Sequence, residues 1–290
     1  MSQIATHPMP SLIHGFYRSL VRLLRLAGLA VWILVGVLVA GFVSLIKPWD
    51  RFRRRMRVRC SDFWLSGALF LIGVRVQVAG KPCPGAVLFA CNHVSWLDIL
   101  VLASACRARF VSKAEVGHWP LLGWFAREGG TLFIRRGDGA SFEAVVELMK
   151  SELSQGERLI FFPEGTTGNG QILRRFRSRL FAAASSPGAS VQPVGLRYRG
   201  SPEVRERVPF LGEATILENL WSILALPMIQ AEACFFDPMQ ISSPSPTPRQ
   251  MALSCESQIG QWLTGSEETV TEGPRTELTS QVTDGWHARG

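Results

Sequence analysis

The stretch from Leu26 to Ile46 contains no charged residue, and almost every side chain in it is apolar (LAGLAVWILVGVLVAGFVSLI). A helix of this length rises by roughly 30 Å, which is about the thickness of the hydrocarbon core of a bilayer. The run is too long for the apolar region of a secretory signal peptide, and no small-residue cleavage site follows it. We therefore predict that residues 26–46 form a membrane helix.

Positive charge is concentrated directly after this apolar run. The segment 47–59 holds six arginines, in a chain whose net charge is +8. Next to an anionic leaflet each such side chain contributes roughly 1 kcal/mol of attraction. Because the charge lies beside an apolar span, an anionic membrane is the expected partner and nucleic acid is not; a solvated charged face is the alternative. The six residues are Arg51, Arg53, Arg54, Arg55, Arg57 and Arg59.

The arrangement of charge also predicts an orientation. Arg18, Arg22 and Arg25 precede the apolar run, but the denser charge follows it, so the positive-inside rule puts the main domain on the cytoplasmic side of the inner membrane. Residues 61–72 are a second apolar stretch that completes a predicted anchor over residues 1–73. This stretch either returns through the membrane as one arm of a hairpin or lies in the interface.

After residue 73, short apolar and β-branched runs alternate with helical segments, which predicts a mixed, mostly parallel α/β sheet flanked by helices. The apolar stripe over 141–153 predicts a helix that packs on the sheet, with Ser141 as its N-cap. The main domain is expected to cover residues 74–241. Its predicted strands are 74–78, 86–91, 109–112, 131–135, 158–162, 191–198 and 229–236.

The C-terminal part changes composition. Residues 242–263 are expected to form a turn-rich linker followed by a short helix near 251–263, and the polar, acidic residues 264–290 are expected to be disordered. Six cysteines are scattered without a CxxC pair or a histidine at metal-ligand spacing, so we expect reduced thiols and neither a metal nor a cofactor. They are Cys60, Cys83, Cys91, Cys106, Cys234 and Cys255.

His93 and Asp98 are the residues whose spacing suggests chemistry. A predicted strand ends at Cys91, so His93 lies just beyond it, where a ligand could reach. A carboxylate five residues later can fold back to bind the imidazole, which fixes the tautomer and leaves the second ring nitrogen free to accept a proton. Taken alone, this spacing is found more often in structural pairs.

Four sequence blocks add to this pair, in the order in which they occur in one enzyme family. Asn92-His93-x4-Asp98 matches the block N-H-x4-D, and Gly130 to Arg136 matches G-x-x-F-I-x-R. Phe162 to Thr167 matches F-P-E-G-T-[ST], and Val191 to Val194 matches V-x-P-V. The chain thus resembles the glycerolipid acyltransferases, typified by 1-acylglycerol-3-phosphate acyltransferase, from the anchor to about residue 240.

The resemblance implies a role for each residue of the blocks. His93 would be the general base and Asp98 the residue that orients it. Arg136, Glu164 and Gly165 would hold the acceptor, with Thr166 as a further donor. A guanidinium suits phosphate oxygens, although a surface salt bridge is the alternative for Arg136. Glu164 would be repelled by a phosphate, so we expect it to orient Arg136 or to accept a bond from a substrate hydroxyl.

One segment departs from the family pattern. Family members often have a glycine in an F-K-x-G-like segment after the third block, and this chain has Phe176-Arg177-Ser178-Arg179 there. The departure leaves open the shape of the entrance for the donor or the acceptor. Arginines at 174, 175, 177 and 179 could attract the phosphates of a donor or an acidic carrier protein, or could form a plain basic face.

The expected reaction is transfer of a fatty acyl group from acyl-CoA or acyl-carrier protein to the hydroxyl of 1-acylglycerol-3-phosphate, which gives phosphatidate. The same chemistry on another lysolipid, such as lyso-ornithine lipid, is the alternative. A phosphate-bearing acceptor should depend on Arg136 more than a zwitterionic amino-acid lipid does. A non-catalytic membrane-tethering protein is the alternative of another class, and it would not need the pair of His93 and Asp98.

Overall fold

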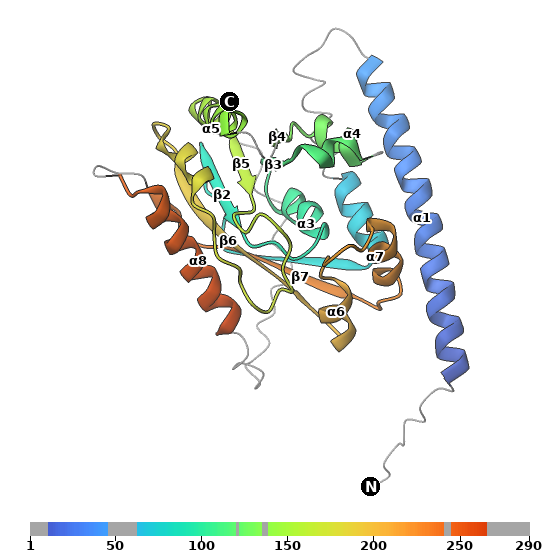
Figure 1. The fold of residues 1–290 in the computed structure, drawn as a ribbon. Coiled ribbons are helices and arrows are strands. Elements are labelled where there is room, and N and C mark those ends of the chain that lie inside the picture. Colours follow the sequence, from blue (N-terminus) through green and yellow to red (C-terminus); the bar gives the residue numbers. More distant parts are fainter. Residues whose placement is uncertain (1–10, 46–62, 120–121, 135–138, 241–244, 266–290) are drawn as a thin grey trace, which may run out of the picture.

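The computed structural model describes residues 11–45, 63–119, 122–134, 139–240 and 245–265. They form an eight-stranded sheet with helices around it (Figure 1). The strand order is β1-β7-β6-β2-β5-β3-β4, and β8 pairs with β6 outside this path. The strands are β1 (Val74–Ala79), β2 (Val87–Cys91), β3 (Arg109–Lys113), β4 (Leu132–Ile134), β5 (Arg158–Phe161), β6 (Ser190–Arg199), β7 (Ile229–Phe235) and β8 (Met239–Gln240).

Most strand pairs are parallel. β6 runs antiparallel to β7 and β8, whereas β1 with β7, β2 with β5 and β6, and β3 with β4 and β5 are parallel. The predicted mixed, mostly parallel α/β sheet and its seven predicted strands are therefore confirmed. The two-residue strand β8 has too few residues for a periodic pattern, and the sequence did not predict it.

Strand β2 lies in the middle of the sheet and every one of its residues is buried. Because side chains alternate along a strand, Phe89 and Cys91 enter the core on one face, whereas Leu88 and Ala90 enter the core on the other. A strand covered on both faces needs a continuous apolar run, and β2 has one. This strand delivers the following residues, Asn92 and His93, to its carboxyl end.

Helices cover both faces of the sheet (Figure 1). The face of Phe89 is covered by α3 (Leu97–Ala105), α6 (Pro202–Arg207) and α7 (Ile216–Ile223). The opposite face is covered by α5 (Gly139–Ser154), the 3-10 helix η2 (Arg179–Ser185) and α8 (Pro248–Thr264). A second 3-10 helix, η1 (Ala114–His118), and α4 (Leu122–Glu128) lie between β3 and β4 in the sequence.

Helix α1 (Ser11–Leu45) flanks this body (Figure 1). Its segment Gly15–Val39 has a mean hydropathy of 2.1, and within the described ranges it is the one helix long and apolar enough to cross a membrane. The second apolar stretch forms a helix over Phe63–Ile72 that packs antiparallel to α1. Trp32 Nε1 donates to the carbonyl of Trp64 (2.9 Å), and a methyl group added to Gly67 would lie 2.2 Å from the Trp32 ring.

The start of α1 differs from the prediction. The helix begins at Ser11 and includes the arginines that were expected to precede it, because these arginines bind the body. Arg18 forms an ion pair with Glu203 of α6 (2.9 Å), and the Arg22 guanidinium lies 4.6 Å from the centre of the Trp221 ring. Arg25 donates to carbonyls just after α7, those of residues 224, 226 and 227. The partial negative charge at the C-terminal end of a helix stabilises a nearby cation such as Arg25.

Two further differences concern helix boundaries. Helix α5 begins at Gly139, so Ser141 lies in its first turn and the prediction that Ser141 is the N-cap is wrong. The expected short helix near 251–263 is confirmed as α8, which begins earlier because Thr247 and Gln250 form a capping box. Its residues Met251 and Cys255 are buried in the core, so the compact body extends beyond residue 241.

Several predictions lie outside the described residues. These are the basic segment 47–59, Arg136, the linker residues 241–244 and the acidic tail 266–290. The cysteines of the described ranges, at positions 83, 91, 106, 234 and 255, are free thiols.

Candidate active site

His93 and Asp98 meet at the carboxyl end of β2. His93 follows the strand by two residues, and Asp98 lies in the first turn of α3. The imidazole Nδ1 is 2.7 Å from Asp98 Oδ2, with the Asp98 side chain fully buried and the His93 side chain 18% exposed. Ligands of parallel sheets bind beyond the carboxyl ends of the strands, and this pair lies at such a position.

Asp98 also shapes the turn that separates it from His93. Its Oδ2 atom accepts hydrogen bonds from the amides of Val94 (2.6 Å) and Ser95 (3.0 Å). These bonds hold the carboxylate in one orientation. With Nδ1 engaged by an anion, the tautomer with its proton on Nδ1 is favoured, and Nε2 keeps a lone pair that can accept a proton.

Tyr198 supplies the second oxygen of Asp98 with a donor. Its hydroxyl, on β6, donates to Asp98 Oδ1 over 2.6 Å. Burial, and secondly the negative charge of Asp98, raises the pKa of Tyr198 well above its usual value, so the phenol remains a donor at neutral pH. No sequence block had pointed to Tyr198. The one available signal was alternation along β6, which puts Val194, Leu196 and Tyr198 on the face that α3 covers.

Asn92 fixes the end of β2 to β6. Its side-chain oxygen accepts from the Leu196 amide (2.6 Å), and its side-chain nitrogen donates to the Leu196 carbonyl (2.8 Å). The side chain thus continues the strand pairing for one more residue. Because His93 is the next residue, its backbone leaves the sheet from a fixed point.

Glu164 joins the loop of the third block to the loop of His93. One carboxylate oxygen accepts from the His93 amide (2.7 Å), and the other accepts from the Arg174 amide (3.0 Å). Burial raises the pKa of Glu164, while these two amide bonds act in the opposite direction. The amide of Gly168 donates to the His93 carbonyl (2.7 Å), so both main-chain groups of His93 are held by this loop.

The remaining block residues have different surroundings. Gly165 has a φ of +70°, a conformation that a side chain would strain, and it turns the chain directly after Glu164. Thr166 is exposed, and the hydroxyl of Thr167 donates to the carbonyl of Phe210. The structure therefore brings His93, Asp98 and Glu164 together, places Gly165 and Thr166 next to them in the chain, and does not describe Arg136.

Phe162 holds the plane of the imidazole. The two rings are stacked, with centroids 3.9 Å apart and an angle of 13° between their planes. Beside this stack is a small hollow, which is lined by Asn92, His93, Val94, Glu164, Gly168, Gly170, Ile172, Leu173 and Leu263. A reacting group in this hollow would meet His93 between apolar side chains and the main chain of the glycine-rich loop.

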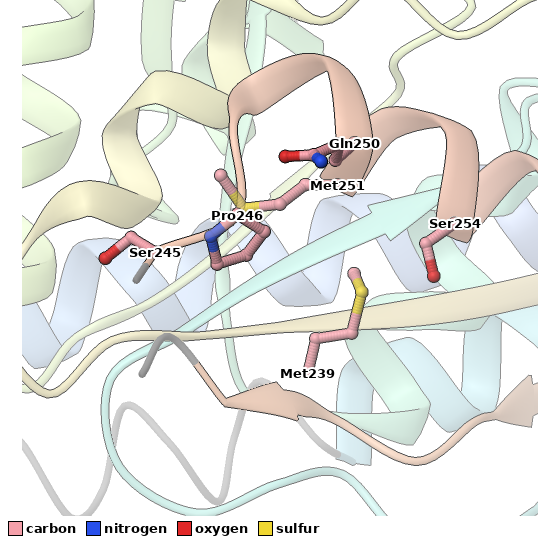
Figure 2. Close-up of a pocket in the computed structure, with 6 residues that line it drawn as sticks. All are labelled: Met239, Ser245, Pro246, Gln250, Met251 and Ser254. Carbon is pink, nitrogen blue, oxygen red and sulfur yellow. The ribbon is translucent and has the colours of Figure 1, made fainter. Parts of the chain in front are cut away.

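A second hollow lies near the start of α8 (Figure 2). Figure 2 shows its lining side chains, which come from α8, from β8 and from the segment before α8, and none of them is titratable. They are Met239, Ser245, Pro246, Gln250, Met251 and Ser254. This set offers neither an acid nor a base.

Comparison with known proteins identifies the class of protein to which this α/β fold belongs. Residues 75–197 match the family model described as Acyltransferase. The chain is 39% identical to a lyso-ornithine lipid O-acyltransferase of Pseudomonas aeruginosa, over 71% of this chain and 79% of that protein. The chain belongs to the acyltransferase family, as its sequence blocks predicted, and it is an enzyme.

One further relative and one solved structure are also similar to the chain. A 1-acyl-sn-glycerol-3-phosphate acyltransferase of Neisseria gonorrhoeae is 32% identical, over 74% of this chain and 82% of that protein. The crystal structure of the 1-acyl-sn-glycerophosphate acyltransferase PlsC from Thermotoga maritima has a TM-score of 0.67 and 17% identity, and the match covers 89% of this chain and all of that one. At this identity the structural match shows a shared fold.

Proposed function

We propose that this enzyme transfers a fatty acyl group from a thioester to the free hydroxyl of a lysolipid, with His93 as general base and Asp98 as the residue that orients it. The observation that carries the proposal is the bond of 2.7 Å between His93 Nδ1 and the fully buried carboxylate of Asp98. It leaves Nε2 as the available base at the carboxyl end of β2. Membership of the acyltransferase family supplies the reaction class.

The reaction proceeds without an acyl-enzyme. The lysolipid hydroxyl lies against Nε2 of His93, which removes its proton as the oxygen attacks the thioester carbonyl. The tetrahedral intermediate collapses, the carbon–sulfur bond breaks, and the thiolate takes its proton from His93. Base assistance of this kind accelerates a reaction by roughly 10²- to 10⁴-fold. The negative charge of Asp98 stabilises the imidazolium that forms during each turnover.

Lyso-ornithine lipid is the first acceptor to test. Two of the relatives that share its name are 39% and 35% identical to the chain. The relative named for 1-acyl-sn-glycerol-3-phosphate is 32% identical, which keeps that lipid as the second candidate. Glu164 in turn acts as the residue that holds the His93 loop, because both of its oxygens bind main-chain amides. Gly165, Thr166 and Arg136 remain candidates for contact with the acceptor or donor.

The outer surface of α1 suits a membrane. Its large apolar side chains are exposed along most of its length, and Phe63 and Phe70 of the neighbouring helix are 70% and 80% exposed. On α7, Leu217 and Trp221 continue this apolar surface beside the arginines of α1. We place these helices in the cytoplasmic membrane and the body on its cytoplasmic side, so that the lipid tails of the acceptor need not cross water.

The test uses the purified enzyme in vesicles. A radiolabelled acyl thioester, either acyl-CoA or acyl-carrier protein, is supplied with lyso-ornithine lipid or with 1-acylglycerol-3-phosphate, and diacyl products and released thiol are both measured. We expect one acceptor to give product in equal amount to the thiol released. Vesicle binding without product from either acceptor would refute the proposal and favour the membrane-tethering alternative.

A further inference from the structure

The loop from Gln171 to Ser178 is held rigidly beside the hollow of His93. The Arg174 amide donates to Glu164 (3.0 Å), the Phe176 amide donates to Glu256 of α8 (2.7 Å), and the Arg177 amide donates to the carbonyl of Pro163 (2.9 Å). Phe176 itself is 5% exposed and belongs to the core. The backbone of this loop is therefore fixed by hydrogen bonds at three of its residues.

The charged side chains of the same loop point away from the body. Arg174, Arg175 and Arg177 are exposed, and none of them forms an ion pair with a residue of the described ranges. Arg179, the next arginine, lies over the Phe142 ring at 4.0 Å. Three cations within four residues repel one another, so a nearby anion would stabilise the arrangement. We call Arg174, Arg175 and Arg177 the basic patch.

The position of the basic patch relates it to the donor. Ile172 and Leu173, directly before it in the chain, line the hollow of His93. The loop binds α8, on one face of the sheet, whereas Leu29 of α1 packs into the core on the other face (Figure 1). The patch thus directly follows residues that line the hollow of His93, it lies on the opposite face of the sheet from the apolar helix, and it is open to a water-soluble partner.

The shape of the patch selects a kind of partner. Small molecules bind in concave sites, and a nucleotide needs a pocket for its base. The two hollows described above contain none of the three arginines. Exposed cations outside these two hollows suit the acidic surface of a protein, which they attract from a distance and orient on arrival.

We propose that the basic patch docks an acidic acyl-carrier protein, so that the thioester at the end of its prosthetic arm reaches His93. This inference rests on the proposed function and names its donor. The rigid loop presents the three guanidinium groups in a fixed arrangement, so little ordering is needed on binding. Acyl-CoA, which has no protein surface to dock, reaches the same thioester position without using the patch.

The experiment compares wild type with the triple variant Arg174→Ala/Arg175→Ala/Arg177→Ala. A matched control, Arg75→Ala/Lys81→Ala/Arg205→Ala, removes the same charge from exposed residues elsewhere on the body. For each protein, kcat/KM is measured with acyl-carrier protein and with acyl-CoA at low and high salt. Binding of unacylated holo-carrier protein to the enzyme in vesicles is measured in parallel.

We expect the triple variant to lose at least about tenfold in kcat/KM with the carrier-protein donor at low salt, since steering by charge acts on the association rate. It should keep the wild-type rate with acyl-CoA and lose the salt dependence of carrier binding. The control should match wild type throughout. Equal losses with both donors, or unchanged carrier binding, would overturn the inference. If wild type were inactive with every donor and acceptor yet bound the carrier through these arginines, the proposed function would fail and the docking surface would stand.

Discussion

Tyr198→Phe removes one hydrogen bond from the centre of the site and almost nothing else. Within the described ranges, the Tyr198 hydroxyl is the one donor to Asp98 Oδ1, while Oδ2 is shared by the His93 ring and the amides of Val94 and Ser95. The variant therefore leaves a buried carboxylate oxygen without its partner, but it keeps the aromatic ring and the three bonds to Oδ2.

The size of the effect follows from the charge on Asp98. Loss of a hydrogen bond to a charged group costs about 1.5–3 kcal/mol, so the variant should unfold more easily by this amount. Asp98 with one donor fewer also holds the His93 ring less firmly, so acyl transfer should slow as well.

Other ionisable groups near Asp98 do not offset this change. Burial, and secondly the charge of Asp98, raises the pKa of Cys91 well above its usual value, so that thiol stays neutral. Glu164 is unchanged by the substitution. The assay measures thermal unfolding and the rate of acyl transfer for wild type, for Tyr198→Phe and for Tyr17→Phe, which alters the one other tyrosine of the chain, an exposed residue on α1. A Tyr198→Phe enzyme that matches Tyr17→Phe in both measurements would refute the reasoning.

Three further predictions concern stability and packing. Because burial raises the pKa of Glu164, the neutral form of this side chain is favoured in the folded state. The stability of wild type relative to Glu164→Gln should therefore fall as pH rises from the usual glutamate range through this raised pKa. Paired thermal unfolding curves measure this, and a stability difference that stays constant with pH would contradict the prediction. Burial raises the pKa of Cys106 and of Cys255 to about 12, so both thiols should resist alkylation at pH 8 until the protein unfolds, as mass spectrometry of labelled peptides can show. Gly67→Val should separate the two N-terminal helices, because the added atoms overlap the Trp32 ring. An engineered cysteine crosslink between the two helices should then form poorly. Crosslinking at the wild-type rate would refute this packing.

The strands of this fold could be predicted because each is a short apolar run between turn residues, and the sheet buries such runs whole. The short helices could not. Helix α3 is apolar on nearly all sides, since Ile99, Leu100 and Ala103 are apolar as well as the buried Leu97, Val101 and Leu102, so it shows no stripe at helical spacing. The start of α1 was misplaced because its arginines carry the charge expected at a membrane surface, while in the structure they bind α6 and α7.

The candidate site also contains residues that the sequence could predict and residues that it could not. His93 and Asp98 lie five residues apart, so local geometry alone could bring them together. Tyr198 reaches Asp98 from a strand 100 residues away, and no local pattern predicts which strand lies beside β2. Glu164 was expected to face a substrate or Arg136; its environment is instead set by the amides of His93 and Arg174, contacts that depend on how two loops cross.

The most direct test of the account is acyl transfer by His93→Ala, measured beside His118→Ala. His118 is an exposed histidine of η1 whose ring lies 3.1 Å from the Ala114 carbonyl, and it serves as the matched control. With both variants folded, we predict that His93→Ala loses at least about 10²-fold in the rate of diacyl product formation and that His118→Ala keeps the wild-type rate. A His93→Ala enzyme that transfers acyl groups at the wild-type rate would contradict the claim that His93 is the base.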